Sequence, residues 1–197
     1  MRDAPFDDLV KSFAGLPGLG PRSARRIALH LLTGGRTEME ALARRLQETA
    51  AQLTRCSICG NLDQTDPCRI CSDQSRNQES LCVISDIADL WAIERTGAYR
   101  GQYHILGGLL SALDGVTRDD LAFKALETRL EGGSFKEVIL ALPATVDGQS
   151  TAHVVEDLAS RHHNRLSITR LARGLPVGGA LDYLDDGTIM TAFKARG

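Results

Sequence analysis

Five cysteines occur in the chain, and four of them form two closely spaced pairs. The pairs are Cys56–Cys59 and Cys68–Cys71, each with two intervening residues, within one short polar stretch. Two such pairs can surround a tetrahedral metal ion from two tight turns, and Gly60 and Pro67 favour the chain reversals that this requires. Four thiolates leave no open coordination position for water, so the pattern predicts a structural Zn²⁺ site rather than a catalytic one.

Two disulfides are the main alternative for these cysteines, and redox-active Cys-x-x-Cys motifs are a second. The first residues, Met1–Asp8, are acidic where a secretory signal peptide would be basic and then apolar, which argues against an oxidising compartment. Neither pair has thioredoxin-like surroundings. Zn²⁺ is therefore the expected cofactor. The fifth cysteine, Cys82, lies in the apolar run Leu81–Ile84, and we expect it to be a buried core thiol.

A second motif with chemical meaning is the turn Leu16–Pro21, with the sequence LPGLGP, which is followed by a basic helix. Its glycines permit positive φ angles and close approach by a ligand, and the turn presents backbone N–H groups at a helix N-terminus, where a phosphodiester can bind. Arginines on the first turns of that helix can neutralise phosphates, without reading base sequence. The expected DNA-binding residues are Gly18, Gly20, Arg22, Arg25 and Arg26. A helix–helix connector without a ligand is the alternative.

Charge is distributed unevenly along the 197 residues, although the net charge is only −2. Residues 1–55 carry nine Lys or Arg and six Asp or Glu, for a net charge of +3, and the remainder carries −5. The first part is therefore where we look for a polyanion partner, and a solvated charged helix face is the alternative explanation. No window approaches the roughly 20 apolar residues of a membrane span, so we expect a cytoplasmic protein without membrane contact.

Hydrophobic periodicity predicts two different architectures along the chain. The N-terminal part has the spacing of three helices, at about 6–14, 22–32 and 37–53. From about Glu79 apolar strands alternate with helices, which predicts an α/β domain with a parallel sheet covered on both faces. The expected strands are 81–84, 103–106, 138–142 and 166–171, and the expected helices are 87–94, 121–130 and 151–161.

These features, in this order, resemble the RecR family of bacterial recombination mediators. The matching motifs are Leu16–Ala24, the two cysteine pairs, Tyr103–Gly108, Leu113–Gly115, Thr145–Gly148 and Thr169–Gly179. The resemblance covers nearly the whole chain. It implies a helix-hairpin-helix in a small α-helical domain (1–54), a four-cysteine zinc finger (55–77), a Toprim domain with a mainly parallel sheet (78–172), and a C-terminal segment with a Walker-B-like strand (173–197).

The resemblance also implies a function without enzymatic activity. Family members form homo-oligomers, from dimers to tetrameric rings, that encircle or clamp single- and double-stranded DNA near the nucleoid. With RecO, and in some pathways RecF, they load the RecA recombinase onto single strands coated by the single-strand-binding protein. In this family Asp147 would belong to the surface that contacts RecO, on a loop that precedes a helix beginning near Ser150.

Two other classes of function remain open. Catalytic Toprim proteins, such as primases, nucleases and topoisomerases, hold Mg²⁺ with a strand-end Glu and an Asp-x-Asp pair. This chain has Ser85 at the first position, no Asp-x-Asp in residues 143–149, and Pro143 where the family commonly has Asn. Oxygen ligands are what Mg²⁺ requires, so few candidates are present. No histidine is paired with a nucleophile in the sequence, and we expect no catalytic residue. The third class is a scaffold whose basic patch binds a protein.

Overall fold

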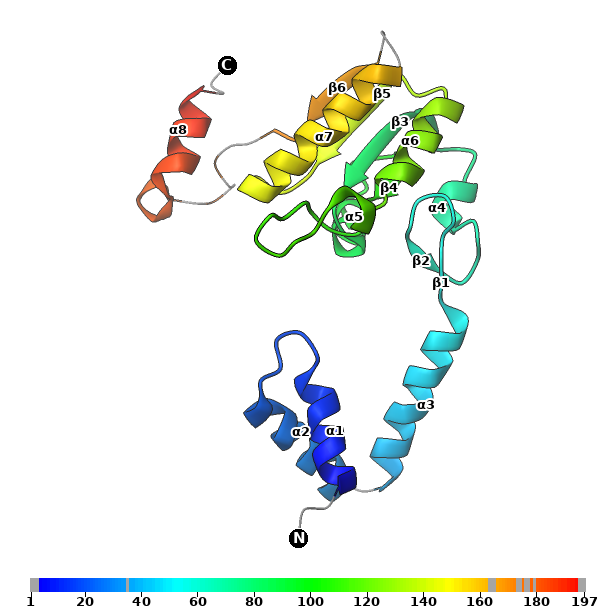
Figure 1. The fold of residues 1–197 in the computed structure, drawn as a ribbon, viewed down its shortest axis with the longest axis vertical. Helices are drawn as coiled ribbons and strands as arrows, with labels where there is room; N and C mark the ends of the chain where they lie inside the picture. The colour runs from blue at the N-terminus through cyan, green and yellow to red at the C-terminus, as the bar shows by residue number, and fades with distance from the viewer. Residues whose placement is uncertain are drawn as a thin grey trace. The chain divides into compact units, whose positions relative to one another are not determined.

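The computed structural model describes residues 4–34, 36–162, 166–172, 175, 178 and 180–194 (Figure 1). It divides into two compact units, Met1–Leu53 and Thr54–Gly197. The first unit contains three helices, α1 (Ala4–Ala14), α2 (Pro21–Thr33) and α3 (Arg36–Gln52). The three helices predicted for this part of the chain are therefore confirmed, with ends that differ by one or two residues.

The α2 helix is the most buried element of the first unit. Its buried residues Ala24, Ala28 and Leu31 follow a spacing of four and three, which places them on one stripe of the helix. The two alanines allow close approach of a neighbouring helix because their side chains end at Cβ. In contrast, the apolar stripe of α3 is largely exposed, and Leu46 has 63% of its surface accessible.

The second unit begins with a small module of two short strands and one helical turn. Strand β1 (Thr54–Arg55) pairs antiparallel with β2 (Leu62–Asp63), and the short helix α4 (Arg69–Ser72) follows. These elements contain the two cysteine pairs. They are too short to bury a core of their own, so the module requires another source of stability.

A four-stranded parallel sheet forms the centre of the second unit. Its strands are β3 (Asn77–Ile84), β4 (Gly101–Ile105), β5 (Glu137–Ala141) and β6 (Ser167–Arg170), in the order β4-β3-β5-β6. Every pairing in this sheet is parallel. The predicted strands and their parallel arrangement are thus confirmed, and β4 is an edge strand.

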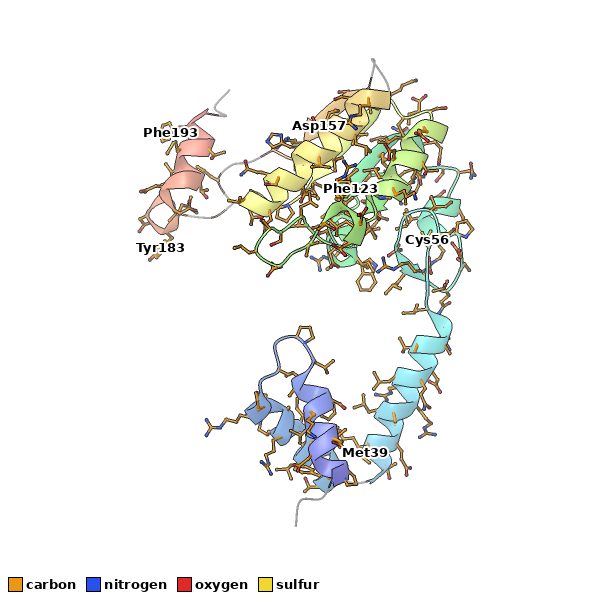
Figure 2. The ribbon with its side chains drawn as sticks, viewed as in Figure 1. Met39, Cys56, Phe123, Asp157, Tyr183 and Phe193 are labelled. Atoms are coloured by element: carbon orange, nitrogen blue, oxygen red, sulfur yellow. The ribbon has the colours of Figure 1, made fainter. Side chains whose placement is uncertain are left out.

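Helices cover both faces of this sheet, as the alternating pattern predicted. The helices are α5 (Ile87–Thr96), α6 (Phe123–Gly132) and α7 (Val146–His162), with a 3₁₀ turn, η1 (Arg118–Asp120), before α6. The larger apolar cluster joins α6 and α7 to one face and includes the buried Phe123, which Figure 2 labels. The smaller cluster joins α5 to the other face and contains Cys82, which is 2% exposed, as expected for a core thiol.

The C-terminal segment differs from the expectation. Residues 180–194 form a 3₁₀ turn, η2 (Leu181–Tyr183), and a helix, α8 (Asp186–Lys194), so the Walker-B-like strand is absent from this range. The Asp185 side chain accepts hydrogen bonds from the backbone N–H (2.9 Å) and the hydroxyl (2.7 Å) of Thr188, which favours a helix start. Part of the motif Thr169–Gly179 lies outside the described residues. No helix in the described ranges is both long and apolar enough to span a bilayer.

Candidate zinc centre and DNA-contact surface

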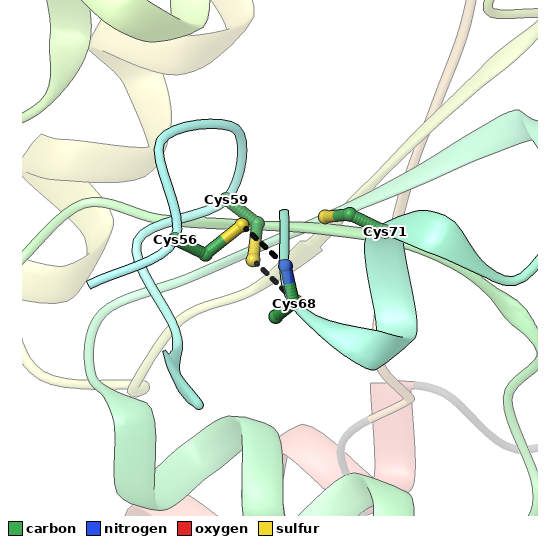
Figure 3. Close-up of side chains that lie close together, drawn as sticks. All are labelled: Cys56, Cys59, Cys68 and Cys71. Carbon is green, nitrogen blue, oxygen red and sulfur yellow. Dashed lines mark hydrogen bonds between the residues drawn. The ribbon is translucent and has the colours of Figure 1, made fainter. Parts of the chain in front are cut away.

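The four predicted metal ligands come together in one cluster (Figure 3). Cys56 and Cys59 lie in the turn between β1 and β2, Cys68 immediately precedes α4, and Cys71 lies within α4. All four sulfur atoms are within 4.8 Å of one another, and the Sγ atoms of Cys59 and Cys68 are 3.6 Å apart. Two separate turns of the chain therefore present their ligand atoms to one point.

These distances fit a tetrahedral thiolate site. A tetrahedron with Zn–S bonds of about 2.3 Å has edges of about 3.8 Å. A disulfide requires about 2.05 Å between sulfurs, and all five cysteines are free thiols here. The residues present thus fit Zn²⁺, and the disulfide alternative does not fit.

Backbone amides support the negative charge that four thiolates would carry. The N–H of Cys68 donates to Cys56 Sγ (3.3 Å), and the N–H of Asn61 donates to Cys59 Sγ (3.5 Å). Hydrogen bonds from the Cys71 thiol and the Asn61 amide lower the pKa of Cys59 to about 6. This direction of the shift favours the Cys59 thiolate, the form that binds a metal ion.

Two aspartates that the sequence analysis did not single out hold the turns of this module. Asp66 Oδ1 accepts hydrogen bonds from both the N–H and the hydroxyl of Ser57, each at 2.8 Å, and so joins the two halves of the module. Asp63 Oδ2 accepts the N–H of Arg69 (2.9 Å) at the start of α4. This N–H group, with that of Gln64, lowers the pKa of Asp63. The location of Asp63 and Asp66 between the two cysteine pairs was the feature of the sequence that could have indicated this role.

The module covers the edge of the sheet. The Ile105 N–H of the edge strand β4 donates to the Cys59 carbonyl at 2.9 Å. Gly60 has a φ of +82°, which favours glycine in this turn, while the space beside Ile105 would admit a Cβ in ordinary contact at 3.5 Å. Two residues earlier, the Arg129 guanidinium donates to the Tyr103 carbonyl. Arg129 comes from α6, too far along the chain for any sequence pattern to connect it with the cysteines.

The helix-hairpin-helix turn lies between α1 and α2. Gly18 has a φ of +79°, which requires glycine, whereas Gly20 is extended (φ −81°, ψ 167°) and forms the N-cap of α2. A Cβ at either glycine would have no atom within 4 Å, so the backbone is open to an approaching ligand. Gly20 provides no side-chain cap, and the N–H groups of Arg22 and Ser23 have no acceptor within the helix. Leu16, the first residue of the turn, is 50% exposed and therefore does not anchor the turn in the core.

The three arginines of this site do not occupy equivalent positions. Arg22 and Arg26 are exposed and lie four residues apart, which places them on one face of α2. The Arg25 guanidinium instead lies over the ring of Phe6, 5.6 Å from its centre, and makes a cation–π contact with α1. Arg22 and Arg26 are therefore the pair best placed to reach phosphates beside the open turn.

Asp147 occupies the first turn of α7, so the predicted loop before a helix near Ser150 is wrong. The helix begins at Val146 because Thr145 caps it, with its hydroxyl accepting the Gly148 N–H at 3.1 Å. A side chain at Gly148 would overlap the Pro143 carbonyl, so this tight entry to the helix requires glycine. Asp147 is partly exposed at the carboxyl end of the sheet.

The acids near Ser85 are engaged in starting α5. The Ser85 hydroxyl donates to Asp89 Oδ2 at 2.6 Å, and the Asp86 N–H donates to the same oxygen at 3.0 Å. The Asp86 side chain in turn accepts the Ala88 N–H, which completes a capping box. Among the described residues, the four cysteines are the one group of three or more metal-type ligands.

Comparison with family models gives four consecutive matches. They are the RecR helix-hairpin-helix at residues 6–50, the RecR zinc finger domain with four cysteines at 53–73, the Toprim domain at 79–172 and the RecR C-terminal model at 174–196. The fold class, with its hairpin, zinc module and mainly parallel Toprim sheet, is therefore confirmed. The zinc finger family together with the clustered sulfurs identifies a zinc-binding site.

Curated relatives give the same assignment over the full length. A "Recombination protein RecR" from Rhodospirillum rubrum is 52% identical over 196 residues, covering 100% of this chain and 98% of the relative. Proteins of the same name from Hyphomonas neptunium and Parvibaculum lavamentivorans are 51% and 52% identical, covering 95% and 97% of this chain and 92% and 95% of the relatives. The chain therefore belongs to the RecR family of recombination proteins.

Proposed function

We propose that this chain is a non-enzymatic, DNA-binding recombination mediator. With RecO, and in some pathways RecF, it helps to load RecA onto single strands coated by the single-strand-binding protein, in the cytoplasm at the nucleoid. The four domains of this mediator are 1–54, 55–77, 78–172 and 173–197. The observation that carries the proposal is the open Gly18–Gly20 turn beside two exposed arginines on α2.

Backbone contact by this turn suits both single- and double-stranded DNA. Free N–H groups at the start of α2 and the charges of Arg22 and Arg26 recognise phosphate and ignore base identity. One protomer provides only two such arginines, with Arg25 as a third that stacks on Phe6. Each neutralised phosphate contributes about 0.9 to the salt dependence of binding, so a single protomer binds weakly at physiological salt.

Self-association would multiply these contacts. The exposed apolar stripe of α3, which includes Leu42 and Leu46, supports a homo-oligomer, because it is left uncovered within the first unit. A dimer or a tetrameric ring then raises the effective concentration of each hairpin at the DNA. Assembly and DNA binding are therefore coupled in this proposal.

RecO is the protein partner, and Asp147 lies on the surface that contacts it. Loops and helix starts at the carboxyl ends of parallel strands are where such folds place ligands. Asp147 is partly exposed there, with no ion pair among the described residues, so its charge is available to a basic partner. The Toprim-type enzyme is the less favoured candidate, because Asp86 and Asp89 are used in capping α5.

A RecA-loading assay tests the proposal. RecA is added to single strands coated by the single-strand-binding protein, and filament formation is followed with and without this chain and RecO. We expect the two proteins together to shorten the lag, and an Arg22→Glu/Arg26→Glu variant to fail. An unchanged lag with the wild type would contradict a mediator role, and Mg²⁺-dependent strand cleavage by the wild type would establish the enzyme instead.

A further inference from the structure

The loop after β4 is a small rigid hairpin at the carboxyl end of the sheet. Ser111 and Val116 form an isolated antiparallel bridge with backbone hydrogen bonds of 3.2 and 2.9 Å. The Ser111 hydroxyl donates to Asp114 Oδ2 at 2.8 Å, and Gly115 has a φ of +70° that completes the turn. These bonds hold the tip of the hairpin, residues 112–115, in one conformation.

Leu113 lies at this tip and is 99% exposed, more than any other large apolar residue described. Its neighbours Leu110 and Val116 pack against the larger apolar cluster, so the base of the hairpin is anchored while the tip is not. Leu113 therefore contributes nothing to the core of its own chain. Because the turn holds the backbone at Leu113, little backbone freedom is lost when this side chain binds, which makes it a favourable anchor for a partner.

The hairpin packs beside the first turns of α7 (Figure 1). The Leu110 N–H donates to the hydroxyl of the buried Thr151 at 2.9 Å, and that hydroxyl donates to the Asp147 carbonyl at 2.7 Å. Val146, the first residue of α7, is 79% exposed. The motifs Leu113–Gly115 and Thr145–Gly148, separate in the sequence, thus lie at the same end of the domain.

Acidic groups accompany the two exposed apolar residues. Asp114 follows Leu113 and Asp147 follows Val146, and no arginine or lysine occurs in residues 101–117 or 137–160. The nearest cation in sequence, Arg118, stacks over the ring of Phe123 at 5.4 Å. Arg170 lines the pocket beside Gly148, but it forms an ion pair with Glu156 at 2.6 Å. The acidic groups Asp114 and Asp147 therefore favour a basic protein at this surface.

We propose that Leu113 and Val146 form the apolar centre of a protein-binding surface, bordered by Asp114 and Asp147. We call it the Leu113–Val146 surface. Its partner is a protein with an apolar pocket surrounded by Lys and Arg side chains. The inference rests on the proposed RecO contact at Asp147 and adds that Leu113, rather than the charge, provides most of the affinity. The charge accelerates encounter.

The test measures binding of purified RecO to the full-length, zinc-loaded chain, with association and dissociation rates at several salt concentrations. Leu113→Ser should weaken the affinity by about tenfold or more through faster dissociation, at every salt concentration. Asp147→Asn should slow association and reduce its salt dependence. Trp91→Ser, at an exposed apolar residue on α5, is the matched control and should bind normally.

Three results would overturn the inference. In the first, Leu113→Ser binds RecO with the affinity and rates of the wild type while Asp147→Asn binds more weakly. The charge of Asp147, and not Leu113, would then provide the affinity. Another is an equal loss in the Trp91→Ser control. The third is a change in oligomer size of Leu113→Ser without RecO, because the surface would then join copies of this chain.

If the wild type binds DNA but not RecO, the partner in the proposed function is wrong. If it binds neither, the mediator proposal itself fails.

Discussion

His104 is a buried residue of β4 with 2% of its surface exposed. Its Nε2 lies 3.0 Å from the Ala122 carbonyl, which requires a proton on Nε2, and its Nδ1 has no partner among the described residues. Burial lowers the pKa of His104 to about 4, so the ring is neutral at physiological pH. The ring therefore joins β4 to the start of α6.

This buried ring makes stability depend on pH. The pKa is about 4 in the folded protein and about 6.5 in the unfolded chain, so between these values the unfolded chain binds the additional proton. The stabilisation is complete above pH 6.5 and is lost as the pH falls toward 4. Between pH 7 and 5 we expect the wild type to lose about 2 kcal/mol more unfolding free energy than His104→Gln. Urea denaturation with zinc content checked at each pH measures this, and equal losses would contradict it.

Arg76 and Glu94 form an ion pair that is largely buried. The guanidinium makes two bonds to the carboxylate, of 2.6 and 3.0 Å, and the Tyr103 hydroxyl donates to the same carboxylate at 2.7 Å. The Arg76 side chain is only 9% exposed, so loss of its partner leaves a buried charge.

Glu94→Gln should therefore lower the free energy of unfolding by about 2 kcal/mol. The matched control is Glu79→Gln, whose bond to Lys136 is equally short at 2.7 Å but largely exposed, and it should change stability by less than about 0.5 kcal/mol. The denaturation midpoints of the two variants, each compared with that of the wild type, measure these changes in stability. Equal effects would mean that burial does not determine the strength of these pairs.

At the scale of elements, the zinc module and the edge strand β4 stabilise each other. The module has no core beyond its cysteines and Ile70, and its Cys59 carbonyl accepts the Ile105 N–H at 2.9 Å. Without the module, the outward Ile105 N–H of β4 would be unpaired, and exposed strand edges promote aggregation.

Cys59→Ala should lose zinc, because three ligands with an open position bind the metal less tightly. Hydrogen exchange at the Ile105 N–H should then accelerate, while the amides of the central strand β3 remain protected. Cys82→Ala is the matched control, since it removes a buried thiol that is no ligand, and it should retain zinc. Elemental analysis and exchange measured by mass spectrometry test this. Full zinc content in Cys59→Ala would contradict the four-cysteine site.

The elements were predictable from sequence to different degrees. The strands of the sheet were predictable because short continuous apolar runs such as Leu81–Ile84 are typical of buried parallel strands in α/β domains. The metal site was predictable because the cysteine spacing determines how the four sulfurs can surround an ion. The predicted start of α7 was wrong because the helix is capped by a hydrogen bond to the Thr145 side chain, and the spacing of hydrophobic residues carries no information about such a bond. Helix α8 was missed for a similar reason at Asp185. Arg129 has no local signature, since its contact with β4 depends on packing between distant segments. Leu113 lies in a motif that the sequence analysis named, but its exposure could not be predicted from that motif.

At the scale of the whole molecule, the proposed DNA contact and the proposed protein contact lie in parts of the chain with opposite net charge. Residues 1–55 carry a net charge of +3 and include the open turn with Arg22 and Arg26, whereas the rest carries −5 and includes the Leu113–Val146 surface. A positive charge favours a polyanion and a negative charge favours a basic protein, so each proposed contact has the charge that its proposed partner requires.

The measurement that tests the DNA-binding claim most directly is the salt dependence of binding for an Arg22→Glu/Arg26→Glu variant. Affinity for a fluorescent single strand and a duplex is measured at several salt concentrations, with zinc content and oligomer size as controls. We predict that the variant keeps its zinc and assembly but no longer binds DNA, or retains a log–log slope lower by about 0.9 for each duplex phosphate that it fails to neutralise. If the variant binds with the affinity and the salt slope of the wild type, the turn between α1 and α2 is only a connector between helices.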